Sequence, residues 1–383
     1  MKNKKLIYIF TGKRGGFSHF IPILDSLNKR KNIDYKIIAS DMHLSKKFGN
    51  TINEIKSYTK KIIKLKKPLQ EDSIGHRLST ISSTITEMGR IFSKRIPTYI
   101  FLLGDRAEVL GAAIASLHYN VPSIHLYGGD ITQGGTDEPT RHAISKLSSI
   151  HLVSNKKSYN NLVQLGEEKW RIHNVGLVSL DLFKKNFFKT KDKLLKKYGI
   201  RPNKPYVILI QHPVTWEIDQ AKSQINETLK SLRKMKLQTL AIYPCSDPGH
   251  EVIIKAYKIE SKKENFKVFK NIDLEDFYSL LKFSELLIGN SSCGITECGY
   301  LKKYVIDIGD RQTGRLRGKN VFHVEHKAKK IQKLLIKIMR KSKSGNMFSD
   351  YGKGDSTKKI NNILNRNYKK NDLIKKKFTE YKI

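Results

Sequence analysis

The segment LIYIFTGKRGGFSHFIPILDSL, residues 6–27, contains the unit from which the fold is predicted. It begins with an apolar run of strand type, Leu6–Phe10, and continues into a glycine-rich stretch, residues 11–18. The apolar residues at 3, 4, 7 and 10 positions after Phe17 share one helix face with it: Phe20, Ile21, Leu24 and Leu27. A strand, a glycine-rich loop and an amphipathic helix in this order are typical of α/β proteins with parallel sheets.

The same alternation continues along the rest of the chain. Short apolar runs recur between amphipathic stretches with helical spacing. We predict strands for further runs at Tyr35–Ala39, Tyr99–Leu103, Ser123–Leu126, Ile150–Val153, Val207–Ile210, Thr239–Tyr243, Glu285–Ile288 and Tyr304–Ile308. The predicted fold class is therefore α/β with doubly wound parallel sheets.

The length of 383 residues is enough for two domains. Each half starts with a strand that leads into a loop and a helix, the first at Leu6 and the second at Val207. A Lys-rich segment from Lys184 to Pro205 lies between the halves, and we interpret it as their connection. We therefore predict two domains that face each other across a cleft, residues 1–183 and residues 184–365.

Composition and charge exclude several classes of protein. The chain has 73 Lys and Arg against 35 Asp and Glu, a net charge of +38, but no zinc finger, RNA-binding signature or heptad repeat, so no nucleic acid partner is expected. We attribute the dispersed Lys excess to genome composition; it is also compatible with an anionic small substrate.

The apolar runs are shorter than the ~18 residues of a membrane span, so no membrane partner is expected. Three cysteines without a CxxC pair predict neither a zinc site nor disulfides, and fit a cytoplasmic protein.

Six loops that directly follow predicted strands contain the candidate functional residues. In open α/β sheets, ligands bind outside the carboxyl ends of the strands, where such loops lie. The loops are residues 11–18, 104–106, 127–142, 211–215, 289–294 and 309–315. Five of the six contain glycine, and all offer groups that can bind phosphate. Together they predict a nucleotide-linked substrate in a cleft between the two domains.

In the first half, each candidate has a functional and a structural interpretation. Loop 11–18 combines glycines with a helix N-terminus, which favours an anion, although a plain tight turn has the same composition; it lacks the GxGxxG pattern of nicotinamide sites. Asp105 is either an acid–base group or the cap of the following helix. Asp137 and Glu138 also precede a helix, so capping explains part of their presence. His142 lies on that helix, on a face that is either functional or solvated.

The candidates in the second half are open to the same two interpretations. His212 either acts as an acid–base group and phosphate ligand or has a structural role. Ser291 and Ser292 precede a helix, so they form a diphosphate cradle or only cap the helix. Glu297 is either a ribose ligand or a surface carboxylate. Arg311 offers phosphate or base contacts, and its alternative is a solvated side chain.

Taken in order, these segments resemble the hydrolysing UDP-N-acetylglucosamine 2-epimerases of sialic acid biosynthesis. The matching strings span nearly the whole chain and are Gly104-Asp105-Arg106, Gly128-Gly129-Asp130, Asp137-Glu138 with Arg141 to Ser148, Gln164 to Glu167, Gln211-His212-Pro213, Tyr243-Pro244 with Ser246-Asp247, Gly289 to Ser292, Ile308 to Gln312 with Gly314-Arg315, and Tyr351-Gly352 with Gly354-Asp355. The string after His212 favours the hydrolysing branch, because the non-hydrolysing epimerases have a basic, Glu-containing string there.

The resemblance implies a fold, a reaction and a set of partners. The fold is two Rossmann-like domains in the glycosyltransferase-B arrangement, with residues 366–383 as a C-terminal helix or tail that packs back on the first domain. The reaction is UDP-N-acetylglucosamine and water to N-acetylmannosamine and UDP, in sialic-acid-type nonulosonate biosynthesis. The resemblance implies a UDP-sugar substrate, no metal, no nicotinamide or other cofactor, and a homo-oligomer, either a dimer or a tetramer.

The resemblance also implies roles for individual residues. Asp105, Asp137 and Glu138 would be acid–base groups at the sugar, and His212 would contact the diphosphate and assist its departure. The remaining positions would bind substrate. In the first half, Arg14 and Ser18 would lie near the sugar and diphosphate, and Arg106, Asp130, Arg141 and His142 elsewhere on the substrate. In the second half, Ser291 and Ser292 would bind the phosphates, Glu297 the ribose and Arg311 the nucleotide.

Three positions depart from the usual residues of the family, all on the sugar side. Tyr127 replaces a Glu or His, Asp130 replaces a Glu, and Gly16 replaces an acidic residue. The sequence therefore leaves the sugar open, and does not separate UDP from GDP. The alternatives are a hydrolase or 2-epimerase of another UDP- or GDP-linked diacetamido sugar of the bacillosamine type, a glycosyltransferase of the same architecture, and a non-catalytic sugar-nucleotide binder.

Overall fold

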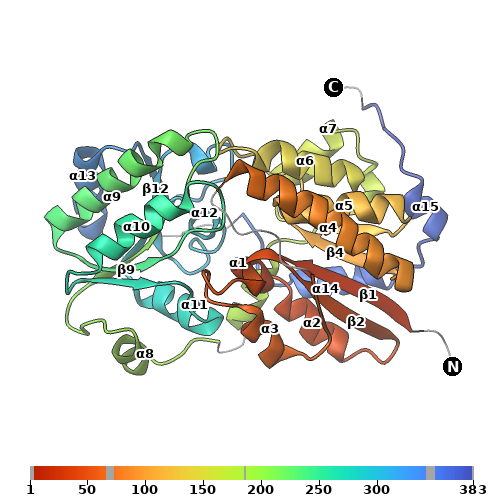
Figure 1. Cartoon of the computed structure of the whole chain (residues 1–383), viewed down its shortest axis with the longest axis horizontal. Coiled ribbons are helices and arrows are strands. Elements are labelled where there is room, and N and C mark those ends of the chain that lie inside the picture. Colours follow the sequence, from red (N-terminus) through yellow and green to blue (C-terminus); the bar gives the residue numbers. More distant parts are fainter. Residues whose placement is uncertain (1–3, 66–72, 185–186, 342–349, 382–383) are drawn as a thin grey trace. The chain divides into compact units, whose positions relative to one another are not determined.

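The computed structural model describes residues 4–65, 73–184, 187–341 and 350–381, without the side chains of Arg14 and Lys184. The chain divides into two compact units (Figure 1). Unit 1 consists of Met1–Ile131, Thr136–Lys184 and Tyr351–Ile383, and unit 2 of Thr132–Gly135 and Lys185–Asp350.

The chain re-enters unit 1 at Tyr351, whereas the sequence-based boundary was residue 366. The reason is helix α14 (Ser356–Leu364), whose Ile360 and Ile363 are buried in the unit 1 core. Two backbone N–H groups at the start of this helix, those of Ser356 and Thr357, also donate to the carboxylate of Asp181 at 3.0 and 2.7 Å.

Unit 1 contains a seven-stranded sheet in which every strand pair is parallel. The strand order is β3-β2-β1-β4-β5-β6-β7. The strands are β1 (Lys5–Thr11), β2 (Ile33–Ala39), β3 (Ile62–Lys64), β4 (Tyr99–Leu103), β5 (Ser123–Leu126), β6 (Ile150–Val153) and β7 (Ile172–Asn174). The other helices are α1 (Arg14–Phe17), α2 (Ile21–Asn28), α3 (Ile52–Tyr58), α4 (Ile74–Lys94), α5 (Ala107–His118), α6 (Asp137–Leu147), α7 (Lys156–Gln164) and α15 (Lys370–Ile374), with 3-10 turns at Asp41–Leu44, Lys169–Arg171 and Val178–Lys184.

Strand β1 shows why the sheet of unit 1 is doubly wound. Its successive side chains point to opposite faces of the sheet. Ile7 and Ile9 pack with α2 and α14 in one core, whereas Tyr8 and Phe10 pack with α4 and α5 in another (Figure 1). A strand buried on both faces needs an unbroken apolar run, which is the pattern seen at the start of the sequence.

Unit 2 contains a six-stranded parallel sheet with the order β10-β9-β8-β11-β12-β13. The strands are β8 (Tyr206–Ile210), β9 (Gln238–Ile242), β10 (Phe266–Phe269), β11 (Leu286–Gly289), β12 (Tyr304–Ile308) and β13 (Val321–Val324). The helices are α8 (Lys191–Lys197), α9 (Ala221–Met235), α10 (His250–Glu260), α11 (Leu274–Phe283), α12 (Ser292–Thr296) and α13 (Ala328–Met339), with 3-10 turns at Ile218–Gln220 and Asp310–Gln312.

When the strands of each unit are numbered from its first, the six strands of unit 2 and the first six of unit 1 have the same order, 3-2-1-4-5-6, and unit 1 adds β7 beside its sixth strand. The order reverses between the first and fourth strands, which are β1 and β4 in unit 1 and β8 and β11 in unit 2. Ligands of doubly wound sheets bind at such a switch point, outside the carboxyl ends of the strands. The predicted α/β fold class is confirmed, and four of the six candidate loops follow the switch-point strands.

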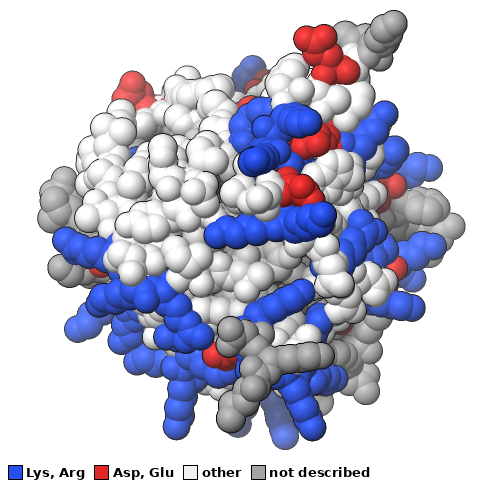
Figure 2. Space-filling model, turned by 90° about the vertical axis from the view of Figure 1, so that its right-hand side faces the viewer, with Lys and Arg blue, Asp and Glu red and all other residues white. Residues whose placement is uncertain are grey.

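The chain has a large excess of cationic side chains, 73 Lys and Arg against 35 Asp and Glu. On the face drawn in Figure 2, Lys and Arg outnumber Asp and Glu and gather toward its lower and right-hand parts. Such a surface attracts anionic small molecules over a distance of about one Debye length, ~8–10 Å at ordinary ionic strength. None of the helices within the described ranges is long and apolar enough to cross a bilayer.

Candidate active site

In unit 1, Arg141 joins the loop after β4 to the start of α6. Its Nε donates to Asp105 Oδ2 at 3.0 Å, and its Nη2 donates to the same oxygen. Its Nη1 donates to Glu138 Oε2 at 2.7 Å and to the backbone oxygen of Asp130 at 2.9 Å. Burial alone would lower the pKa of Arg141, but the surrounding carboxylates, Asp105 above all, raise it above the ordinary arginine value. A permanently charged guanidinium therefore holds two of the predicted acid–base residues in fixed positions.

Asp105 is a partly accessible member of this cluster. It follows the switch-point strand β4, and its side chain is 13% exposed, whereas that of Arg141 is 1% exposed. His125 binds the backbone of the same loop. Burial lowers the pKa of His125 to about 3, so its ring is neutral. Its Nε2 donates to the backbone oxygen of Gly104 at 2.7 Å. His125 thus fixes the backbone next to Asp105, and Arg141 binds the carboxylate of Asp105 directly.

The first turn of α6 carries two further acidic groups. Glu138 Oε1 accepts from His142 Nε2 at 3.0 Å, one turn along the helix. Asp137 Oδ1 lies 3.6 Å from Nη2 of Arg77, a residue of α4. Carboxylates near a helix N-terminus are stabilised by the backbone N–H groups there. The structure therefore brings Asp105, Glu138, Arg141 and His142 together, with Asp137 on the same turn.

Arg106 belongs to a second, more deeply buried ionic cluster. Its Nε donates to Glu108 Oε1 at 3.0 Å, and its Nη2 lies 3.3 Å from Asp41 Oδ2. The pKa of Glu108 is raised overall, because the effects of burial and of the nearby Asp41 charge outweigh the opposite effect of Arg106. A Cβ at Gly12 would lie 2.2 Å from Glu108 Oε1, so the glycine of the loop after β1 makes room for this carboxylate. Asp41 is not among the residues predicted from the sequence, and its place in the loop after β2 is the signal that could have identified it.

The other predicted residues of unit 1 make contacts within the protein framework. Ser18 is 1% exposed and donates its hydroxyl to the backbone oxygen of Gly15 at 2.9 Å. The carboxylate of Asp130 accepts from the hydroxyl of Ser158, in the first turn of α7. The side chain of Arg14 lies outside the described part of the structure.

Tyr127, one of the departures from the family pattern, is part of a tyrosine–histidine pair. Its hydroxyl is hydrogen-bonded to Nδ1 of His19 at 3.0 Å and accepts from the backbone N–H of Val178 at 3.0 Å. Burial and the charge of Lys13 lower the pKa of His19 to about 3, so its ring is neutral at ordinary pH. The non-glycine φ of 67° at Tyr127 directs the chain out of β5 into the glycine-rich loop.

In unit 2, Asn290 connects the loops that follow β8, β11 and β12. Its side chain accepts from the backbone N–H of His212 at 2.7 Å and donates to the backbone oxygen of His212 at 2.9 Å. Its own backbone oxygen accepts from Arg311 Nη1 at 3.2 Å and from Gln312 Nε2 at 3.0 Å. Asn290 is 1% exposed, so it fixes His212 and Arg311 from inside the protein. Asn290 lies in the predicted loop 289–294 but is not among the candidate residues predicted from the sequence.

The ring of His212 has a defined tautomer. Its Nδ1 accepts from the backbone N–H of Cys245 at 3.0 Å. A neutral imidazole has one N–H, so the proton of His212 lies on Nε2. From there it can donate to a phosphate oxygen at the switch point of unit 2.

Ser291, Ser292 and Glu297 lie around the short helix α12. Ser291 is the residue before the helix, and its hydroxyl contacts Cys293 Sγ at 3.3 Å. Glu297 is 3% exposed and accepts from the hydroxyls of Tyr278, at 3.2 Å, and Thr296. Burial raises the pKa of the Cys293 thiol to about 12, so it is protonated at neutral pH and is no nucleophile.

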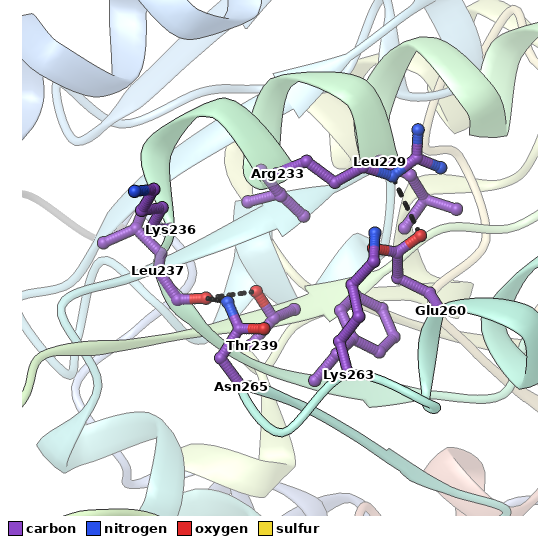
Figure 3. Close-up of a pocket in the computed structure, with 10 residues that line it drawn as sticks. Leu229, Arg233, Lys236, Leu237, Thr239, Glu260, Lys263 and Asn265 are labelled. Carbon is purple, nitrogen blue, oxygen red and sulfur yellow. Dashed lines mark hydrogen bonds and ion pairs between the residues drawn. The ribbon is translucent and has the colours of Figure 1, made fainter.

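A pocket of unit 2 lies away from these groups (Figure 3). It has a volume of about 220 Å³, and none of the predicted site residues lines it. It lies beside the first residues of β9 and β10, at the edge opposite the carboxyl ends. Glu260 within it is paired with Arg233 at 2.9 Å and with Lys263 (Figure 3). No group of His, Cys, Asp and Glu within the described ranges has a metal-binding arrangement.

Comparisons with known proteins show which family and fold the chain resembles. The family model for UDP-N-acetylglucosamine 2-epimerase matches residues 25–365. The chain is 34% identical over 324 residues to the hydrolysing UDP-N,N'-diacetylbacillosamine 2-epimerase of Legionella pneumophila, covering 84% of this chain and 85% of that protein. It is 32% identical over 330 residues to a UDP-N-acetylglucosamine 2-epimerase of Neisseria meningitidis, covering 85% of each.

Solved structures show the same fold at lower identity. The UDP-GlcNAc 2-epimerase of Methanocaldococcus jannaschii, in complex with UDP-GlcNAc and UDP, superposes with a TM-score of 0.79 at 19% identity, covering 94% of this chain and 99% of that one. The UDP-GlcNAc 2-epimerase of Neisseria meningitidis bound to UDP-GlcNAc gives a TM-score of 0.77 at 18% identity, with the same coverage. Both similarities extend over the two parallel sheets.

Proposed function

Because the chain belongs to the UDP-N-acetylglucosamine 2-epimerase family, we propose that it converts UDP-N-acetylglucosamine and water to N-acetylmannosamine and UDP. The observation that carries this proposal is the Asp105–Arg141–Glu138 cluster at the carboxyl end of β4. Relatives with 31–34% identity include hydrolysing 2-epimerases and a polysialic acid biosynthesis protein of Escherichia coli. N-acetylmannosamine would then serve the synthesis of a sialic-acid-type nonulosonate.

The reaction has two stages. In the first, the C1–O bond to UDP breaks and the proton at C2 is removed, which gives a 2-acetamidoglucal. In the second, water adds to C1 and a proton returns to the opposite face of C2. The C2 proton is only weakly acidic, so C–O cleavage leads, and the positive charge that builds up at C1 acidifies it.

In this proposal the residues of unit 1 act on the sugar. Asp105 removes the C2 proton, and Arg141 holds its carboxylate in one orientation. Glu138, which is hydrogen-bonded to His142, returns a proton to the other face, with Asp137 on the same helical turn. Acid–base residues of this kind typically contribute ~10²–10⁴-fold to the rate.

The residues of unit 2 bind and release the nucleotide. His212 donates from Nε2 to the departing diphosphate, and Arg311 supplies positive charge. Ser291 and Ser292 bind phosphate oxygens, and Glu297 accepts from the ribose. Fixed donors that meet a developing negative charge are the largest source of catalysis in many enzymes.

The test is incubation with UDP-N-acetylglucosamine in deuterated water. We expect UDP and N-acetylmannosamine in equal amounts, with one deuterium at C2 of the product. Absence of UDP release, or a product without deuterium at C2, contradicts the proposed reaction. UDP binding without turnover would instead identify a binder, and a requirement for a sugar acceptor would identify a glycosyltransferase.

A diacetamido sugar is the second candidate substrate. Two relatives, from Legionella pneumophila and Campylobacter jejuni, carry names that specify N,N'-diacetylbacillosamine, at 34% and 31% identity. The same assay with UDP- and GDP-linked N,N'-diacetylbacillosamine separates the candidates by their kcat/KM ratio.

A further inference from the structure

The last carbonyl groups of helix α6 are bound by a lysine from a distant part of the sequence. Lys376 Nζ donates to the backbone oxygens of Ser145 at 2.8 Å, Lys146 at 2.9 Å and Ser148 at 2.8 Å. The final carbonyls of a helix have no partners within it, and a cation is favoured at that end. Lys376 therefore caps the helix whose first turn carries Asp137 and Glu138.

The ammonium group of Lys376 is itself held by a buried carboxylate. Glu167 Oε2 lies 2.6 Å from it, and the side chain of Glu167 is 0% exposed. His151 Nε2 donates to the same oxygen at 2.8 Å. Burial lowers the pKa of Lys376 to about 8, so the group is still charged at neutral pH. The cap is thus a partly desolvated charge with partners on two sides.

The segment that presents Lys376, which we call the tail (residues 370–381), is fixed on unit 1. Arg171 is 1% exposed and donates to the backbone oxygens of Asp372 at 2.6 Å and Leu373 at 3.1 Å. Leu373 is buried in the unit 1 core. The hydroxyl of Tyr381 donates to the backbone oxygen of Glu167 at 3.1 Å. Contacts on both sides of Lys376 therefore determine where its ammonium group lies.

A short chain of contacts leads from the cap to Asp105. Ser145, whose backbone oxygen accepts from Lys376, donates its hydroxyl to His125 Nδ1 at 3.1 Å. The other ring nitrogen of His125 donates to the backbone oxygen of Gly104, next to Asp105. Arg141 lies one helical turn before Ser145 and binds Asp105 directly. Two routes thus connect the end of α6 with the same carboxylate.

We propose that Lys376 is a positioning residue, which by capping α6 sets the geometry of Asp105 through Ser145, His125 and Arg141. The tail is then part of the active-site framework of unit 1. The kinetic consequence rests on the proposed function, whereas the effect on α6 does not.

The first test compares Lys376→Met with Lys377→Met. Lys377 is the next residue and is exposed, so its variant removes the same charge from the same segment. We expect Lys376→Met to lower kcat by about 10- to 100-fold, the effect of a small misplacement of reacting groups. KM should stay unchanged, because the groups proposed to bind the diphosphate belong to unit 2. Lys376→Arg, which keeps charge and donors, should recover most of kcat.

The second test uses Lys376→Ala and added amines. Propylammonium restores the missing atoms and N–H donors, whereas tetramethylammonium restores only a charge. We expect propylammonium alone to raise the kcat of Lys376→Ala, with no effect on Lys377→Ala. A merely structural loss of stability would not respond in this selective way.

Amide hydrogen exchange provides a readout without substrate. We expect faster exchange in the last turn of α6 in Lys376→Met than in Lys377→Met, at a temperature where both are folded. Equal exchange rates would overturn the proposal whether or not the enzyme acts on UDP-N-acetylglucosamine. Faster exchange with an unchanged kcat would overturn the positioning role. If the unsubstituted enzyme releases no UDP, the proposed function fails, and exchange alone decides whether Lys376 orders α6.

Discussion

Asp105 illustrates how the role proposed for a single side chain depends on its neighbours. It follows a switch-point strand, it is held by a buried guanidinium, and it is only slightly exposed. None of these properties belongs to aspartate alone. The position after a strand could be predicted from the sequence, but the hydrogen bonds from Arg141 depend on how α6 packs.

Replacing Asp105 by Asn tests its proposed role. The amide keeps an oxygen for Arg141 but cannot accept a proton at neutral pH. We expect kcat to fall by about 10²–10⁴-fold, with the Kd for UDP unchanged, as measured by UDP release and calorimetry. Asp192→Asn, an exposed change in α8, is the matched control. An Asp105→Asn enzyme with the kcat of this control would exclude Asp105 from proton transfer.

Several important residues could not be predicted from the sequence. His125 and Asn290 are polar groups buried in or beside strands, and their partners are far away in the sequence. Glu108 is similar, because its contact with the loop after β1 exists only once the sheet has formed. Such positions follow from tertiary packing, whereas Glu138 and His142 could be found because they lie on one short stretch of helix.

At the scale of elements, the place of a strand in its sheet decides whether it could be predicted from the sequence. All nine predicted strands are present, because central strands are buried on both faces and read as apolar runs. The four strands that were missed are β3, β7, β10 and β13, which are the outermost strands of the two sheets. An edge strand such as Ile172–Asn174 is short and partly exposed, so its side chains give no apolar pattern.

The loop after β1 offers a prediction at the same scale. A Cβ at Gly12 would meet the buried side chain of Glu108, whereas one at Gly15 would meet nothing within 4 Å. We expect Gly12→Ala to lower the free energy of unfolding by about 1–3 kcal/mol, because Glu108 must move against its pairing with Arg106. Gly15→Ala should leave it unchanged or raise it by about 0.4–1 kcal/mol. Urea unfolding measures both, and equal stabilities would contradict the steric argument.

For the whole molecule, buried histidines predict how stability depends on pH. Burial lowers the pKa of His125 to about 3 and those of His43 and His151 to about 4. The unfolded chain binds protons to these groups near pH 6.5, before the folded chain does. Their contribution to stability is therefore complete above about pH 6.5 and is lost as the pH falls toward 4, with a slope of at most about 1.4 kcal/mol per pH unit for each histidine.

Urea unfolding between pH 7 and pH 4 measures this dependence. Replacing His125 by Gln should make the slope shallower, since one buried titrating group is removed. His118→Gln, on an exposed residue, should leave the slope unchanged. A slope that is identical in all three proteins would show that His125 is not excluded from protonation in the folded state.

The return of the chain to unit 1 at Tyr351 also constrains the order of events on the ribosome. Helix α14 and Leu373 complete a core whose other buried members are synthesised within the first 184 residues. At translation rates of about 5–20 residues per second, the ribosome makes unit 2 over roughly ten seconds or more while that core lacks its cover. The unit that is begun first is therefore finished last. While unit 2 is being made, the apolar face of unit 1 is still uncovered, and we expect a chaperone to be needed most during that period.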